Sequence, residues 1–196
     1  MGSDPLHAFY TGWGALRLVN GLMLSASKVV ARYYDVAKDA GLSDGGEWSR
    51  TFTVPAAAAN SEVAVTLVWT DPAATPSAAA ALVNDLDLVV VDGAGAEFKG
   101  NAHLGLEGLY EEWGHEGSGG ADRLNNVEGV RIPRGAAGEY TVTVRAHKVS
   151  IGLPQGFAVV ALYRMPETSS RLNSQDLINV LGCPPPPSPP PPPPRE

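Results

Sequence analysis

Two carboxylates placed two positions apart are the side chains in this sequence best suited to chemistry. Asp85 and Asp87 alternate with Leu86 and Leu88 inside residues 82–91, whose apolar, β-branched composition predicts a strand. Side chains at i and i+2 of a strand lie on one face. We therefore expect the two carboxylates to point at one spot while the leucines enter the core. Because like charges on one face repel, a hard cation with oxygen ligands is a natural partner.

More oxygen-bearing side chains stand before a later strand candidate. Calcium takes about six to eight oxygen ligands from carboxylates, amides and carbonyls. We therefore expect a structural calcium site built from Asp85 or Asp87 with part of residues 125–128. The ligands expected for it are Asp85, Asp87, Asn125, Asn126 and Glu128. The alternative is that the Asn and Asp side chains cap turns by bonding to local backbone, while Asp85 pairs with Arg123 or Arg131. The spacing matches no EF-hand loop.

These residues need strands to position them. The sequence pattern from Trp48 onward predicts such strands. Seven short apolar segments are separated by Gly, Pro, Asn and Asp turns, which is typical of an antiparallel β-sandwich or barrel. The candidates are residues 49–54, 63–69, 86–91, 96–99, 127–132, 139–146 and 157–163. The period of two predicts these inward-facing side chains: Phe52, Val65, Leu67, Trp69, Leu86, Leu88, Val90, Val127, Val130, Tyr140, Val142, Val144, Phe157, Val159 and Ala161.

The two ends of the chain differ from this middle part. Residues 16–23 carry apolar side chains at helical spacing, which predicts a short N-terminal helical segment. Residues 28–40 fit a helix face and a strand equally well. Residues 101–126 form a long Gly-rich and acidic loop, which is typical of functional or mobile loops. The proline block at 184–194 has no backbone N–H groups for a sheet, so we expect a polyproline II tail over residues 183–196.

Composition excludes several classes of function. The chain has 196 residues, 44% of them apolar, and a formal net charge of −7. The negative charge argues against nucleic acid and anionic membranes as partners. No apolar run approaches the roughly 18 residues of a membrane span, and residues 1–5 lack the pattern of a signal peptide. The single cysteine, Cys183, cannot form a disulfide within the chain.

A series of motifs resembles the C-terminal region of subtilisin-like serine proteases (subtilases, peptidase family S8). In order, they are Gly-Trp-Gly at 12–14, Val-Thr-Leu-Val-Trp-Thr-Asp at 65–71, Val-Asn-Asp-Leu-Asp-Leu at 83–88, Asn-Asn-Val-Glu at 125–128 and Gly-Glu-Tyr-Thr-Val-Thr-Val at 138–144. In such proteases a jelly-roll β-sandwich follows the catalytic domain. The resemblance favours a strand at residues 29–34. It implies a remnant of the catalytic domain over residues 1–27, the sandwich over 28–165, a linker over 166–182 and the proline-rich tail over 183–196.

The same resemblance implies that the catalytic residues lie elsewhere. The catalytic serine of a subtilase belongs to a Gly-Thr-Ser motif, which this sequence lacks. Ser3, Asp4 and His7 are the right residue types, but a triad must converge from a rigid scaffold, and these three share one short stretch. We therefore assign no catalytic residue and expect the chain alone to be inactive. The other histidines are expected to be solvated or on the surface: His103, His115 and His147.

Two hypotheses of different class follow. In the first, the chain is the C-terminal sandwich of a subtilisin-like endopeptidase, which stabilises the catalytic domain or helps to place a protein substrate. In the second, it is a stand-alone extracellular binding or cell-wall module on a proline-rich stalk, since the proline block resembles those of green-algal and plant wall glycoproteins. Both hypotheses place the protein outside the cell or in the cell wall.

Overall fold

Two four-stranded antiparallel sheets make up the part of the chain that this computed structural model describes, residues 28–102 and 120–165. One sheet has the order β1-β8-β3-β6 and the other β2-β7-β4-β5. The strands are β1 Val29–Val36, β2 Glu47–Val54, β3 Ser61–Val68, β4 Asp85–Val91, β5 Glu97–Lys99, β6 Val127–Gly135, β7 Gly138–Lys148 and β8 Phe157–Arg164, with single 3-10 turns at η1 Lys38–Ala40 and η2 Ala56–Ala58.

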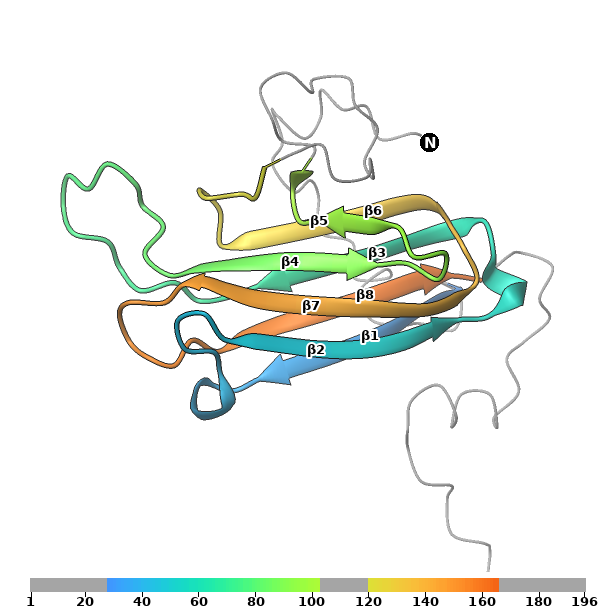
Figure 1. The fold of residues 1–196 in the computed structure, drawn as a ribbon, viewed down its shortest axis with the longest axis horizontal. Helices are drawn as coiled ribbons and strands as arrows, with labels where there is room; N and C mark the ends of the chain where they lie inside the picture. The colour runs from blue at the N-terminus through green and yellow to red at the C-terminus, as the bar shows by residue number, and fades with distance from the viewer. Residues whose placement is uncertain (1–27, 103–119, 166–196) are drawn as a thin grey trace, which may run out of the picture. The chain divides into compact units, whose positions relative to one another are not determined.

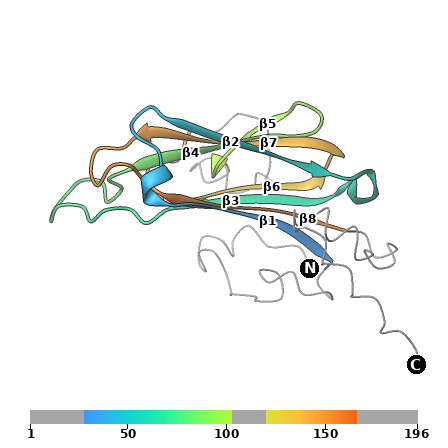
Figure 2. The same cartoon turned by 90° about the horizontal axis from the view of Figure 1, so that it is seen from below.

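The sheets lie face to face (Figures 1 and 2), so the predicted antiparallel β-sandwich is confirmed. All seven strand candidates are strands in the structure, with ends shifted by a few residues. Residues 29–36 form an eighth strand, which resolves the choice between helix and strand there. β1 pairs with β8 from Val29 opposite Arg164 to Val36 opposite Phe157. The expected N-terminal helical segment and polyproline tail lie outside the described residues.

The core lies between the sheets and follows the two-residue period of the strands. Leu86, Leu88 and Val90 on β4 are at most 1% exposed, as are Tyr140 and Val142 on β7. Burying one such side chain stabilises the fold by about 1.5–3 kcal/mol. Fourteen of the fifteen residues predicted to face inward are buried, and these are Phe52, Val65, Leu67, Trp69, Leu86, Leu88, Val90, Val130, Tyr140, Val142, Val144, Phe157, Val159 and Ala161.

The prediction for Val127 is wrong, and the register of β6 explains why. Glu128 stands opposite Leu67 of β3, and Val130 stands opposite Val65. Leu67 and Val65 of β3 face the core, so Glu128, Val130 and Ile132 of β6 face it too. Val127 therefore lies on the outer face, partly exposed, and its neighbour Glu128 is turned inward at 1% exposure.

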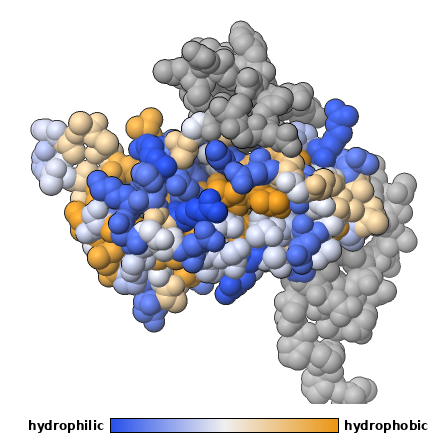
Figure 3. Space-filling view, viewed as in Figure 1, coloured by the Kyte–Doolittle hydropathy of each residue, from blue (hydrophilic) through white to orange (hydrophobic). Residues whose placement is uncertain are grey.

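The outer face of the β2-β7-β4-β5 sheet is polar and carries the two aspartates. Figure 3 looks onto this face, where hydrophilic side chains predominate over a smaller apolar patch. Cross-strand pairing places Asp87 opposite Arg145, which in turn stands opposite Glu47 on the edge strand β2. Arg145 and Glu47 form an ion pair with an Nε–Oε2 distance of 2.9 Å. Because both partners are more than half exposed, this pair contributes little stability, about 0–1 kcal/mol.

Candidate functional site

Asp85 and Asp87 do share one face, and a single arginine lies between them. The Arg123 guanidinium donates from Nη1 to both carboxylate oxygens of Asp85 at 3.0 Å. It donates to both oxygens of Asp87 as well, with Nη2 to Oδ2 at 3.3 Å. The alternative expected from the sequence, an ion pair of Asp85 with Arg123, is thus present. Arg131 is engaged elsewhere, with Glu62 on β3 at 3.1 Å.

One arginine does not fully compensate this cluster. Asp85 is 7% exposed, and burial raises the pKa of its carboxyl, as does the negative charge of Asp87, against the lowering effect of Arg123. Desolvation disfavours the charged form of any buried acid. The raised pKa therefore indicates that Arg123 offsets part of the cost of burying this carboxylate.

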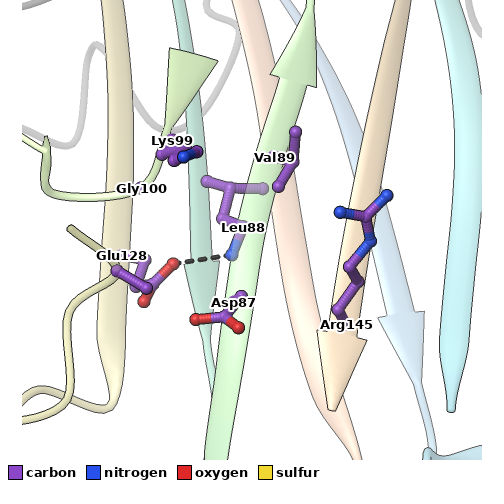
Figure 4. Close-up of a pocket in the computed structure, with 8 residues that line it drawn as sticks. Asp87, Leu88, Val89, Lys99, Gly100, Glu128 and Arg145 are labelled. Atoms are coloured by element: carbon purple, nitrogen blue, oxygen red, sulfur yellow. Dashed lines mark hydrogen bonds between the residues drawn. The ribbon is translucent and has the colours of Figure 1, made fainter. Parts of the chain in front are cut away.

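Glu128 is the most unusual side chain of the site. It projects from β6 of one sheet, and its Oε2 accepts a 2.6 Å hydrogen bond from the backbone N–H of Leu88 on β4 of the other sheet (Figure 4). Its Oε1 is buried and has no hydrogen-bond partner. Burial raises the pKa of Glu128 to about 8, with smaller contributions from the charges of Asp87, Asp122 and Asp85. This carboxyl thus bridges two sheets and leaves one oxygen unsatisfied.

Glu128 can reach the backbone of β4 because the neighbouring strand β5 is short. β5 has three residues, and its pairing with β4 is followed by one more hydrogen bond, from the Gly100 N–H to the Leu88 carbonyl at 2.8 Å. The Leu88 N–H is then bonded by Glu128 instead of by a strand. A side chain at Gly100 would not fit, since a Cβ there would overlap the Glu128 carboxylate. The glycine therefore lets the carboxyl reach the edge of β4.

The asparagines predicted as calcium ligands have other partners. The exposed Asn125 donates to Asp122 Oδ2 at 2.6 Å, and Asn126 donates to the backbone carbonyl of Trp69 at 2.9 Å. Asp122 also accepts a bond from the buried Asn101 at 2.7 Å. The turn-capping alternative is present at Asp122, whose Oδ1 accepts the backbone N–H groups of Leu124 and Asn125, whereas Asn101 and Asn126 bond to distant parts of the chain.

A second polar centre is built around Asn84. Its side chain is fully buried and forms hydrogen bonds with the loop that precedes β8. Nδ2 donates to the Ile151 carbonyl and to Gln155 Oε1, both at 2.8 Å, and Oδ1 accepts from the backbone N–H groups of Ser150 and Ile151. In the sequence, the feature that pointed to Asn84 was its position in the Val-Asn-Asp-Leu-Asp-Leu motif.

Asp71 completes this centre from the end of β3. Its carboxylate accepts the backbone N–H groups of Val83 and Asn84, each at 2.8 Å. The Trp69 indole donates to the Asn84 carbonyl at 2.9 Å. Together these bonds close the long connection between β3 and β4. The Trp-Thr-Asp and Val-Asn-Asp motifs thus hold a loop in place.

His147 lies on β7 with its side chain exposed, as expected. Ser3, Asp4, His7, His103, His115 and Cys183 fall outside the described residues. Among residues 28–102 and 120–165, no three His, Cys, Asp or Glu side chains gather to hold a metal ion by themselves. The expected calcium site therefore stays a prediction.

Two hollows accompany these polar centres. The smaller is a cavity of about 130 Å³ beside β4, and Asp87, Lys99, Gly100, Glu128 and Arg145 line it (Figure 4). The larger, about 670 Å³, is an open groove where β1, β3 and β8 end. Its lining mixes the apolar Val68 and Phe157 with the polar Asp35, Lys38 and Gln155.

Comparison with known proteins links the chain to serine proteases. It is 31% identical over 171 residues to the serine protease/ABC transporter B family protein tagB of Dictyostelium discoideum, a match that covers 76% of this chain and 9% of that protein. It is also 34% identical over 102 residues to tagA, a protein of the same description from the same organism. That match covers 50% of this chain and 5% of tagA. The chain thus spans less than a tenth of the length of either relative. No protein-family model matches it.

None of the helices in the described residues is long and apolar enough to cross a membrane.

Proposed function

We propose that this chain is the C-terminal β-sandwich portion of a subtilisin-like serine endopeptidase, in which it stabilises the catalytic domain or helps to place substrate. The observation that carries the proposal is the 171-residue match to a protein described as a serine protease/ABC transporter B family protein. The motif series seen in the sequence and the sandwich fold agree with it.

The uses of the motif residues support a structural role. The side chains of Asp71, Asn84 and Asn101 form hydrogen bonds with backbone groups of neighbouring loops and of β6. A nucleophile or general base must instead present a reactive atom to a substrate. In this proposal these polar residues therefore keep the sandwich together rather than take part in a reaction.

The groove between β1, β3 and β8 is where substrate placement would occur. It is open and offers Asp35 and Lys38 beside exposed apolar surface of Val68, a mixture that suits an extended polypeptide. In keeping with the proline-rich tail, we place the protein outside the cell or in the cell wall.

The test compares the native protease polypeptide with a version that lacks residues 28–165. If the sandwich stabilises the catalytic domain, the truncated form should lose activity faster on heating, while kcat/KM for a short peptide stays within about twofold. If it places substrate, KM for a protein substrate should rise and the short peptide should be unaffected. Unchanged heat inactivation together with unchanged KM contradicts the proposal.

A further inference from the structure

We propose that the outer face of the β1-β8-β3-β6 sheet is the surface on which the protease catalytic domain docks, an inference that rests on the proposed function. The centre of this face is apolar, and the described chain begins at its corner. In Figure 2 the β2-β7-β4-β5 sheet lies above the β1-β8-β3-β6 sheet, so the outer face is the lower one.

The outward side chains of this sheet are mostly apolar and short. Along β8 the odd-numbered side chains from Phe157 to Tyr163 are buried in the core, so the even-numbered ones point outward. Strand pairing places these residues on the same outer face: Ala31, Tyr33, Ala64, Thr66, Val68, Val127, Gly129, Ala158, Val160 and Leu162. A sheet face in contact with water usually carries polar side chains instead. The composition of this face therefore suits a covered surface.

Two of the larger apolar side chains on this face are exposed. Tyr33 is 53% exposed and Val68 is 40% exposed. The other sheet differs, because its outer face carries the charged Asp87 and Arg145 side by side. A contiguous exposed apolar patch marks an interaction site, so the β1-β8-β3-β6 face is the one of the two that fits a protein partner.

Charged side chains border the apolar centre at both ends. At one end, Glu62 of β3 pairs with Arg131 of β6 at 3.1 Å and with Arg164 of β8 at 3.7 Å. At the other end, Asp35 of β1 is exposed. An apolar centre with a polar rim is the usual anatomy of a protein interface. The rim charges would fix the orientation of the partner more than its affinity.

The size of the face fits an interface between two domains of one chain. Its four strands lie about 4.8 Å apart, and eight residues at about 3.3 Å each give a face of about 500 Å². Interfaces between domains of one chain bury about 600–1,500 Å² over both partners, or about 300–750 Å² on each. The face is thus large enough for such an interface.

The path of the chain identifies which domain docks. β1 begins at Val29, and the Met165 N–H donates to the Lys28 carbonyl at 2.8 Å, so the described chain begins and ends side by side at one corner of this sheet. A catalytic domain that precedes residue 28 is tethered there, which raises its effective concentration at the face. The groove assigned to substrate borders the same face at Val68 and Ala158, so the docked domain would lie next to it.

The experiment compares cysteine labelling in the native protease polypeptide with that in the purified chain, both with Cys183→Ser. Val160→Cys places a thiol on the apolar face, and Thr141→Cys is the matched control on the outer face of the other sheet. Both residues are partly exposed and lie on the second strand of their sheets. A maleimide labels the thiols, and peptide mass spectrometry locates them. Both positions should label at similar rates in the purified chain, whereas in the protease polypeptide position 160 alone should label at least about tenfold more slowly.

The outcomes separate this proposal from the proposed function. If removal of residues 28–165 speeds heat inactivation but position 160 labels equally fast in both proteins, the stabilising role stands and this docking face is wrong. Protection of position 160 with unchanged heat inactivation supports the docking face and removes the stabilising role. Slow labelling of position 160 in the purified chain means that a segment of the chain or a second copy covers the face, which overturns the proposal. If Val160→Cys does not fold, Leu162→Cys on the same face replaces it.

Discussion

Replacing Asn84 by alanine should strongly destabilise the sandwich. The substitution removes four side-chain hydrogen bonds that tie the start of β4 to residues 150–155. Water can replace the bonds to Ser150 and Ile151, both exposed at the surface. It cannot readily reach Gln155, which is 7% exposed and whose Oε1 is left without the Asn84 donor.

The magnitude follows from these bonds. An unsatisfied buried oxygen costs about 1–3 kcal/mol, and each lost hydrogen bond that water replaces costs about 0.5–1.5 kcal/mol. One unsatisfied oxygen and three bonds that water replaces add up to at least about 2.5 kcal/mol. We therefore expect Asn84→Ala to lower the free energy of unfolding by about 2.5–4 kcal/mol, because larger losses from one substitution are exceptional. Urea unfolding in the presence of chelator measures this loss, and the midpoint should fall without a change in slope.

Asn125 is the matched control, because it is an exposed asparagine whose amide bonds to the side chain of Asp122. Asn125→Ala should change the free energy of unfolding by no more than about 0.5 kcal/mol. If Asn84→Ala costs less than about 1 kcal/mol, or no more than the control, the loop before β8 is not held by this side chain and the reasoning is refuted.

Three further outcomes are expected. The pKa of Glu128, about 8 in the folded state against an ordinary 4.5, means that the folded state keeps a proton that the unfolded chain releases. Stability measured in chelator should therefore fall as pH rises from about 4.5 to about 8, and Glu128→Gln should flatten that fall. Gly100→Ala should cost about 1–3 kcal/mol in urea unfolding because its Cβ would overlap the Glu128 carboxylate, whereas Gly120→Ala, with open space around it, should be neutral. Deleting residues 183–196 should leave the melting temperature unchanged, and a drop of several degrees would count against a separate tail.

The fold could be predicted from local pattern because the strands are strongly periodic. Leu86 and Leu88 face the core, and Asp87 lies on the outer face, as alternation requires. The turn residues placed the strand ends to within a few positions. Residues 28–40 remained ambiguous because β-branched and aromatic residues at that density fit a helix face as well, and pairing with β8 decided the matter.

The site was less predictable because distant parts of the chain define it. Val127 looked like the inward residue of β6, yet the pairing with β3 turned Glu128 inward instead. Hydrophobicity alone could not have indicated this, since a glutamate is almost never fully buried without a partner. The burial of Asn84 depends on Ile151 and Gln155, about seventy positions away. The pairing of Asp85 with Arg123 was foreseen only as one of two choices.

A fluorophosphonate probe, which labels activated serines, tests most directly whether this sandwich belongs to a serine protease. The native product should be captured from its source with an antibody raised against residues 28–165, then labelled and sized. We expect a labelled polypeptide much larger than the 20.5 kDa of this chain, and no labelling of the purified chain itself. A native product of about 20.5 kDa that takes no label would contradict membership of a protease and favour a stand-alone wall or binding module.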